Sequence, residues 1–323
     1  MKVYMAGKLD NMLSTTLFHA MAELGHTGLI LCEPKDKYVS LGYFDNAEEL
    51  IDLEKCKELG IGVIRRRIGG GAVLLAPGQV FYQLILPKNL VPFKVEDAYR
   101  KLSKPVIEAY RRLGLEVEYK PINDLVVKAA RRKISGQGAG DIGRNFVFVG
   151  NILLKFEPEL MAEVLKVPKE SFRELLKKSL WENIGWLERE IGTAHEFEEV
   201  AHVLFESFSK ELPLEGMAQL PEDAFELAQK LKEEMTSEES IREETPRRHP
   251  FIKIREGVYV RNVYHDGLEF QLVVADGKIA YLRGFGQLDR MLIGLPYSKE
   301  ELIPYLNVKG VEAEKFTKLL FDS

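Results

Sequence analysis

The 323-residue chain is short of cysteine: it has two, Cys32 and Cys56, and no CxxC motif. Two cysteines exclude a disulfide-rich scaffold and a cysteine zinc site. The six histidines are scattered, and His195 and His202 are seven residues apart, which does not fit the i, i+4 spacing of paired metal ligands on a helix. We therefore expect two buried apolar thiols and no structural metal site.

Long apolar runs and an excess of positive charge are missing as well. No segment approaches the roughly 18–20 apolar residues of a membrane span, and residues 1–15 lack the apolar core of a signal peptide. The net charge is -5, whereas proteins that coat nucleic acid are usually basic. These absences predict a soluble, cytoplasmic protein that binds neither membranes nor nucleic acid, and they leave a local basic pocket open.

Apolar residues make up 46% of the chain, enough for one large domain or two ordinary ones. Hydrophobic spacing predicts helices and strands in alternation up to about residue 156, and helices from there to about residue 235. The helices expected in the first part are residues 11–24, 47–60 and 94–113, and the strands are residues 28–32, 38–43, 61–65, 80–86, 115–120, 124–129 and 146–156. The predicted fold class is α+β, with helices packed against a mostly antiparallel sheet.

A second, small α+β domain is predicted at the end of the chain. Residues 232–250 are almost wholly polar and contain two prolines, which is typical of a linker. Beyond them, Asp-Gly turns at 266–267 and 276–277 separate alternating strands, and two helical segments follow. We expect a first domain over residues 1–245 and a second over residues 246–323.

The stretch RRRIGGGAV, residues 65–73, places three arginines directly before three glycines. Glycine allows positive φ and lets a ligand approach the backbone without meeting a Cβ. Backbone N–H groups beside guanidinium groups form a chemically sensible site for a phosphate or carboxylate. The alternative is a structural turn preceded by solvated arginines. The loop is not a P-loop, because the chain has no GxxxxGK[ST] motif.

A second unusual stretch, residues 122–140, reads INDLVVKAARRKISGQGAG and places Lys133 just before Ser135 and Gly136. A lysine beside a tight glycine turn can act as a point charge over a phosphate. The alternative is an exposed hairpin lysine among other basic residues. The glycines of residues 136–143 imitate a dinucleotide fingerprint only weakly, because a strand rather than a helix is expected after them.

Together, the segments RRRIGGGAV, NDLVV and KISGQG resemble those of the lipoate–protein ligase family, which shares its fold with biotin protein ligases and lipoyl or octanoyl transferases. The resemblance covers residues 1–215 well, and the last domain resembles the family's accessory domain. It implies that the protein activates lipoate or octanoate with ATP and Mg²⁺ to an acyl-adenylate. The acyl group would then pass to a lysine of a lipoyl-carrier domain, of the H-protein or 2-oxoacid dehydrogenase E2 type.

The resemblance also implies roles for single residues. Arg66 would bind the nucleotide phosphates, Lys133 would be the catalytic residue between the acyl carbonyl oxygen and the α-phosphate, and Asp124 would contact magnesium or the ribose. The residues implied to bind ATP or the acyl-adenylate are Arg66, Gly69, Gly70, Gly71, Ala72, Val73, Leu74, Asp124, Lys133, Ser135 and Gly136. Arg65 completes the arginine pair of the family, and Arg67 is interpreted as a solvated extra.

Several positions depart from the family pattern. They are Ile68 in place of Ser or Thr, Leu75 in place of His, Phe148 and Val149 in place of a His-His pair, and Thr15 in place of an acidic residue. The hydrophobic replacements make the expected pocket more apolar and remove donors. Three hypotheses stay open: an ATP-dependent ligase, an acyltransferase that uses a carrier thioester without ATP, and a non-catalytic relative that binds an acyl-adenylate or a lipoyl domain.

The cysteines help to separate the first two hypotheses. Transferases of this superfamily use a cysteine nucleophile, but neither Cys32 nor Cys56 falls within residues 115–136, where a thiol could face Lys133. The sequence therefore favours the ligase. By the same resemblance, the accessory domain would close over the site during activation; the alternative is a rigid appendage.

Overall fold

The computed structural model describes residues 1–245, 251–265 and 267–322. The chain divides into two compact units: unit 1 is Met1–Lys166 with Ile184–Arg248, and unit 2 is Val167–Asn183 with His249–Ser323. Unit 2 therefore includes residues 167–183, which the sequence analysis assigned to the first domain. Spacing within a helix indicates that one face is buried, but not which part of the chain covers it.

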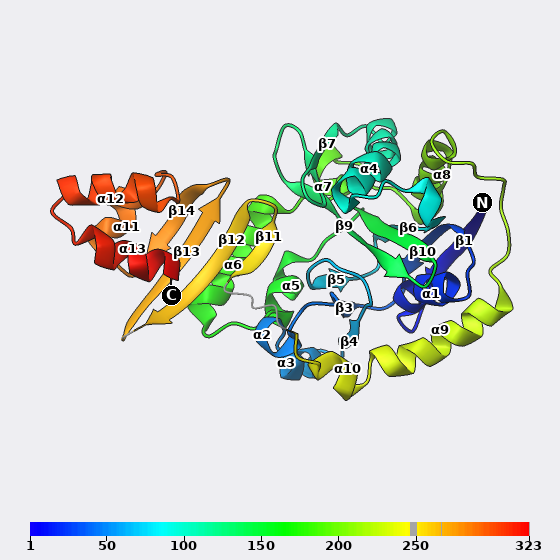
Figure 1. Cartoon of the computed structure of the whole chain (residues 1–323), viewed down its shortest axis with the longest axis horizontal. Helices are drawn as coiled ribbons and strands as arrows, with labels where there is room; N and C mark the ends of the chain where they lie inside the picture. Colours follow the sequence, from blue (N-terminus) through cyan, green and yellow to red (C-terminus); the bar gives the residue numbers. More distant parts are fainter. Residues whose placement is uncertain (246–250, 266, 323) are drawn as a thin grey trace. The chain divides into compact units, whose positions relative to one another are not determined.

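A seven-stranded sheet, in the order β1-β2-β6-β10-β9-β8-β7, forms the centre of unit 1 (Figure 1). Its strands are β1 (Lys2–Leu9), β2 (Gly28–Pro34), β6 (Gln79–Pro87), β7 (Val117–Lys120), β8 (Asp124–Val127), β9 (Lys133–Ile142) and β10 (Asn145–Leu153). β1 and β2 run parallel, and the remaining pairs are antiparallel. The predicted α+β fold with a mostly antiparallel sheet is confirmed.

Helices cover both faces of this sheet. On one face, α4 (Val95–Arg112) and α8 (Phe197–Ser209) share a core with the sheet, and on the other face α1 (Leu13–Glu23) and α9 (Glu222–Met235) share a second core. β6 supplies both cores, because Tyr82 and Leu84 enter the first and Phe81 and Ile85 the second. Side chains of a strand alternate between faces, so a strand buried on both sides is apolar throughout, as the segment VFYQLIL is.

A smaller three-stranded sheet carries the arginine-glycine stretch. Its order is β4-β3-β5, with β3 (Tyr38–Leu41), β4 (Gly62–Arg65) and β5 (Val73–Leu75). Residues 66–72 connect β4 to β5; we call them the glycine loop. The helix predicted over residues 47–60 is two helices, α2 (Ala47–Leu50) and α3 (Leu53–Glu58), because Ile51 is extended and the Asp52 side chain caps α3 by accepting from the Lys55 N–H.

The strands β1, β5 and β9 are additions to the sequence prediction. β9 was not predicted, because three of its ten residues are glycines, which have low strand propensity. The other helices of unit 1 are α5 (Pro158–Val164), α7 (Leu187–Ile191), α10 (Glu238–Arg242) and the 3₁₀ turn Lys88–Leu90. In the described part of the chain, no helix has the length and apolar character needed to cross a membrane.

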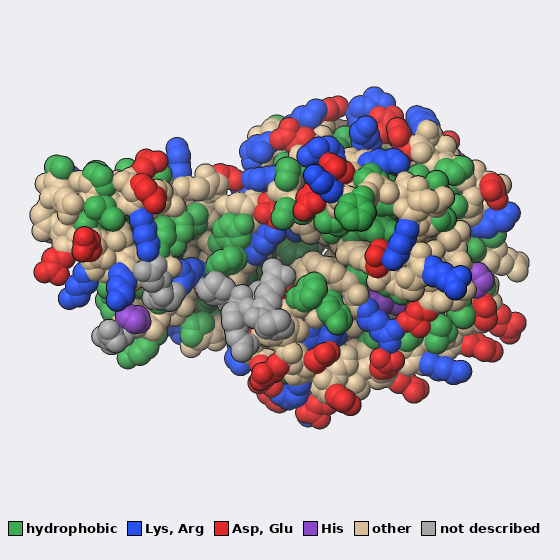
Figure 2. Space-filling view, viewed as in Figure 1, with side chains coloured by type: hydrophobic (Ala, Val, Ile, Leu, Met, Phe, Trp, Pro, Cys, Tyr) green, Lys and Arg blue, Asp and Glu red, His purple; other side chains and the backbone are tan. Residues whose placement is uncertain are grey.

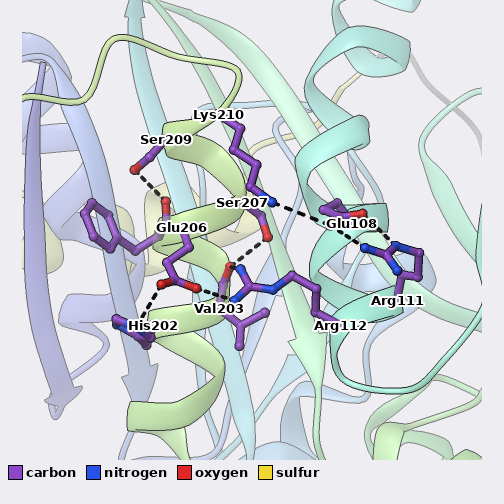
Figure 3. A network of polar contacts seen from close by, with 10 residues as sticks. Glu108, Arg111, Arg112, His202, Val203, Glu206, Ser207, Ser209 and Lys210 are labelled. Carbon is purple, nitrogen blue, oxygen red and sulfur yellow. Dashed lines mark hydrogen bonds and ion pairs between the residues drawn. The ribbon is translucent and has the colours of Figure 1, made fainter.

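α4 and α8 are joined at the surface by ion pairs (Figure 3). Arg111 binds Glu108 with an Nε–Oε2 distance of 2.8 Å, Lys210 lies 3.7 Å from the same carboxylate, and Arg112 pairs with Glu206. These side chains line a surface cleft of about 430 Å³. The cations that line the cleft are paired with its two glutamates, and the ion pairs of Lys210 with Glu108 and of Arg112 with Glu206 connect the two helices.

Unit 2 is a four-stranded antiparallel sheet with helices. Its elements are α6 (Glu170–Asn183), β11 (Ile252–Arg255), β12 (Val258–His265), β13 (Leu268–Ala275), β14 (Lys278–Arg283), α11 (Gln287–Leu292), α12 (Lys299–Val308) and α13 (Ala313–Asp322). α6 packs beside β11 and β12 (Figure 1), and the Lys169 Nζ lies 2.6 Å from the Glu269 Oε1. Because of these contacts, residues 167–183 belong to unit 2.

One of the two predicted Asp-Gly turns can be followed in the structure. Asp276 and Gly277 both have positive φ, 48° and 79°, and they connect β13 to β14 as a tight hairpin turn does. Asp266 of the other turn lies outside the described residues, as do residues 246–250 of the expected linker. On the face seen in Figure 2, acidic and basic side chains are interspersed, in keeping with the modest net charge.

Candidate functional site

The glycine loop lies directly on one face of β9, formed by Gly136, Gly138 and Gly140. We call this face, which carries no side chains, the strip. A Cβ built on Gly138 would lie 3.1 Å from the Gly69 carbonyl oxygen, and a Cβ built on Gly140 would lie 3.1 Å from the Ile68 Cγ2. Alternate residues of a strand share a face, so Gly136 lies on the same side as these two glycines. The glycines of β9 therefore make room for the loop, and they do not form a dinucleotide fingerprint.

Lys133 lies at the other end of this strip. Its Nζ is 2.8 Å from the Asp124 Oδ1, and a Cβ built on Gly136 would lie 3.1 Å from the same Nζ. The Asp124 side chain is fully buried, whereas that of Lys133 is 21% exposed. At a rise of about 3.3 Å per residue, the lysine contact at Gly136 and the loop contact at Gly138 are roughly 7 Å apart. The fold thus brings both sequence motifs to one surface.

Arg66 is buried inside the glycine loop and holds it in shape. Its guanidinium donates to the carbonyl oxygens of Ser40 at 2.9 Å, Gly71 at 2.8 Å and Gly69 at 3.2 Å. Burial lowers the pKa of Arg66, and the nearby Asp45 opposes this shift, but an arginine stays charged in either case. The bonds in the structure are therefore to the loop backbone, and a phosphate contact stays a prediction.

The outer two arginines bind other segments. Arg65 is buried and donates to main-chain carbonyls that include those of Asp45 and Ile241. Arg67 pairs with Glu23 of α1 and Glu234 of α9. Arg67 is partly exposed, as a solvated arginine is, but two helices distant in sequence also place carboxylates beside it.

His19, which the sequence did not single out, supports the start of the glycine loop. It is fully buried in α1, where its Nε2 accepts from the Arg67 N–H at 3.0 Å and its Nδ1 lies 2.8 Å from the Thr15 carbonyl oxygen. Burial lowers the pKa of His19 to about 3, so the ring is neutral and can accept from the backbone at neutral pH. No pattern marks this residue, since a single histidine in a helix is ordinary.

The departures from the family pattern fall on different sides of the sheet. Ile68 lies over Gly138 and Gly140, and the Val149 Cγ2 is 3.6 Å from the Cβ position of Gly138. Phe148 points to the opposite core, where its ring lies 6.0 Å from that of Tyr82. Leu75 is buried in the core beside α1, and the Thr15 Oγ1 lies 2.9 Å from the Tyr38 hydroxyl. Ile68 and Val149 therefore make the strip apolar, whereas the other replacements belong to the interior.

The Ser135 side chain points away from the strip. It is fully buried, with its Oγ 3.3 Å from the Tyr82 hydroxyl, which also accepts from the Gln137 amide at 3.1 Å. Ser135 and Gln137 share the face of β9 opposite the glycines. Any ligand contact of Ser135 would have to use its backbone, and this contact stays a prediction. In the glycine loop, Gly71 is exposed and Ala72 is half-buried, and in β5 Val73 is exposed and Leu74 is buried.

A magnesium ion would need help from substrate oxygens here. Among the described residues, no three His, Cys, Asp or Glu side chains cluster as a metal site. Mg²⁺ is commonly held by one or two carboxylates together with substrate phosphates. Asp124 has the right chemistry but is committed to Lys133, so its role as a metal ligand stays a prediction.

Residues 9–209 match the sequence profile of the lipoyl protein ligase A/B catalytic domain. The chain belongs to this family. It is 27% identical over 188 residues to lipoate-protein ligase A subunit 1 of Thermoplasma acidophilum, which covers 56% of this chain and 70% of that protein. It is also 27% identical over 197 residues to octanoyltransferase LipM of Oceanobacillus iheyensis, which covers 55% and 70%. Lipoyl protein ligase A/B relatives thus include both ligases and octanoyltransferases.

Solved structures of lipoate-protein ligases share the fold. The bi-partite lipoate protein ligase of Thermoplasma acidophilum, described with its E2 lipoyl domain, aligns with a TM-score of 0.67 and 25% identity over 75% of this chain and 95% of its own. A lipoate-protein ligase A bound with ATP aligns with a TM-score of 0.61 and 23% identity over 74% and 98%. The family resemblance inferred from the motifs is confirmed.

Proposed function

We propose that the protein is an ATP-dependent lipoate–protein ligase, which activates lipoate or octanoate to an acyl-adenylate and transfers the acyl group to a lysine of a lipoyl-carrier domain. Within the family, the burial and position of the two cysteines favour a ligase over a transferase that uses a cysteine nucleophile. Cys32 is buried in β2, four strands from β8, and Cys56 is buried in α3. Burial raises the pKa of the Cys32 thiol far above its usual range and that of Cys56 to about 11.

A transferase that uses a cysteine nucleophile requires a thiolate that its substrate can reach. Neither thiol of this chain meets that requirement, and neither lies on the strip between Lys133 and the glycine loop. Activation by ATP does not need a thiol, because the carboxylate of the acid attacks the α-phosphate directly and displaces pyrophosphate. The position of the cysteines therefore supports the ligase.

Lys133 suits the activation step. Attack of a carboxylate on an α-phosphate brings two anions together, so the site must supply positive charge. The ion pair with buried Asp124 fixes the ammonium over Gly136, and N–H groups of a glycine-rich loop can add donors. Preorganised groups of this kind lower an activation barrier by about 3 kcal/mol each. Mg²⁺ held by Asp124 and the phosphates would neutralise further charge.

The proposed acceptor is a lipoyl-carrier domain, of the H-protein or 2-oxoacid dehydrogenase E2 type. The likeness to a ligase described with an E2 lipoyl domain supports this choice. In the second step the lysine amine displaces AMP from the acyl carbon, which requires the amine to be positioned and to lose its proton. No covalent enzyme intermediate is required.

The test is to incubate the protein with lipoate, ATP, Mg²⁺ and candidate lipoyl domains, and to detect acyl-adenylate and the modified lysine by mass spectrometry. Lys133→Ala should lower the rate of adenylate formation by about 100-fold or more, as loss of a preorganised charge does. The double variant Cys32→Ala/Cys56→Ala is the matched control and should keep its activity. Full activity of the Lys133→Ala variant would contradict the proposed catalytic role of Lys133.

The LipM relatives support a second candidate, an octanoyltransferase that needs no ATP. Transfer from an octanoyl-carrier without nucleotide, abolished in the double cysteine variant, would establish that function in place of the ligase. Tight binding of lipoate and ATP without turnover would instead identify a non-catalytic relative.

A further inference from the structure

Residues 238–245 lie beyond residues 9–209, the part that matches the family profile, yet they contact the arginine beside the glycine loop. Arg65 donates to the carbonyl oxygens of Ser240 at 2.6 Å, Ile241 at 2.8 Å and Glu243 at 3.1 Å. Carbonyls at the end of a helix lack partners within the helix, and a cation is favoured there. Arg65 thus binds the C-terminal end of α10.

The same guanidinium binds the loop that follows β3. It donates to the carbonyl oxygens of Asp45 at 2.6 Å and Tyr43 at 3.3 Å. The Tyr43 N–H in turn donates to the Ile68 carbonyl oxygen at 3.0 Å. Arg65 therefore links residues 238–245 to the glycine loop through the backbone of residues 43–45.

A second contact ties the same two segments. The Thr245 N–H donates to the Asn46 Oδ1 at 2.7 Å, the Asn46 amide donates back to the Thr245 carbonyl at 3.3 Å, and the Thr245 hydroxyl donates to the Phe44 carbonyl at 2.6 Å. Residues 42–46 also touch the glycine loop directly, because a Cβ on Gly42 would lie 1.9 Å from the Gly70 carbonyl oxygen. Residues 42–46 therefore pack directly against the loop.

We propose that residues 238–245 position the glycine loop, with Arg65 and Asn46 as the positioning residues that transmit this order. Neither side chain needs to touch a substrate. Arg65 fixes the backbone before the glycines, and Asn46 fixes the end of residues 238–245 against the same loop. The consequence for ligand binding rests on the proposed ligase function, whereas the consequence for loop order does not.

Hydrogen exchange of the full chain without ligand tests the coupling. Asn46→Ala should raise the exchange rates of the Arg66 and Arg67 amides at least about threefold, since local order governs such rates. Asn262→Ala is the matched control, because it removes an amide that donates to Glu269 within unit 2, and it should leave these rates unchanged. Faster exchange in residues 238–245 with unchanged rates at Arg66 and Arg67 would overturn the proposal.

Thr245→Val provides the second variant, which removes the hydroxyl bonds to the Phe44 carbonyl and the Asn46 Oδ1 and keeps the backbone bond to Asn46. It should give a smaller change of the same sign, and it decides the question if Asn46→Ala does not fold. With an active ligase, both variants should raise the KM for ATP by about 3- to 10-fold with a smaller change in kcat, as loss of ground-state positioning does. Absence of ligase activity in the wild type would reject the proposed function and leave the exchange result intact.

Discussion

Three consecutive arginines occupy three different environments. Arg65 binds carbonyls of α10 and of the loop after β3, Arg66 binds carbonyls of the glycine loop, and Arg67 pairs with carboxylates of α1 and α9. A guanidinium presents five donors in a fixed fork, which suits carbonyl groups that converge from different segments. At this scale the stretch holds the loop in place, and its phosphate contact stays a prediction.

The neutral His19 makes stability depend on pH. Its pKa is about 3 in the folded protein and 6.5 as an unperturbed group, so the unfolded state binds a proton first as the pH falls. The contribution of this residue is fully present above pH 6.5 and is lost between about pH 6.5 and 3, by at most about 1.4 kcal/mol per pH unit.

We expect His19→Gln, which keeps an acceptor for the Arg67 N–H, to flatten this dependence. The measurement is urea unfolding at pH 7, 6, 5 and 4 for both proteins, with the free energy of unfolding compared at each pH. The difference between the two proteins isolates the contribution of residue 19. Parallel curves for wild type and His19→Gln would show that His19 titrates normally in the folded state.

The elements of the site meet at a face of β9 that carries no side chains. The glycine loop packs on Gly138 and Gly140 of β9, and Gly136 leaves space for Lys133. The intervening residues Ser135 and Gln137 point into the core. A strand that alternates glycine with buried residues thus has one smooth face, and the loop can lie flat against it.

Within the glycine loop, the three glycines should respond differently to substitution. Gly70 has φ 105°, and a Cβ there would lie 2.6 Å from the Arg66 Nη2, whereas a Cβ on Gly71 would meet no atom within 4 Å. Gly70→Ala should therefore lower the free energy of unfolding by about 1–3 kcal/mol, and Gly71→Ala should lower it much less. Chemical denaturation of both variants provides the measurement, and equal losses would contradict this account of the loop.

At the scale of the whole molecule, unit 2 is built from two separate pieces of the chain. α6 lies more than 60 residues before β11 in sequence but packs beside it and β12. The mostly polar residues after α9 indicated a domain boundary near residue 245. The polarity of a linker does not show that an earlier helix, here α6, packs with the domain that follows the linker.

Leu176, fully buried on α6, should stabilise unit 2. Leu176→Ala is expected to cost about 2–5 kcal/mol and to raise hydrogen exchange in β11–β14 more than in β6 and β10. Leu204→Ala, a fully buried leucine of α8 in unit 1, is the matched control with the opposite expected pattern. If both variants loosen the same strands, α6 does not belong to unit 2 as a stability unit.

The sequence by itself determined the fold class, the family, most helices and strands, and the two motifs that meet at β9. These follow from local periodicity and from residues close together in the chain, which depend on backbone preferences and short-range packing. The tertiary structure decided what each arginine binds, why β9 needs its glycines, and that residues 167–183 belong to unit 2. His19 contacts Arg67 across 48 residues, and Arg65 contacts Ile241 across 176. Such contacts arise when distant segments pack together, and nothing in the local sequence encodes which segments will meet.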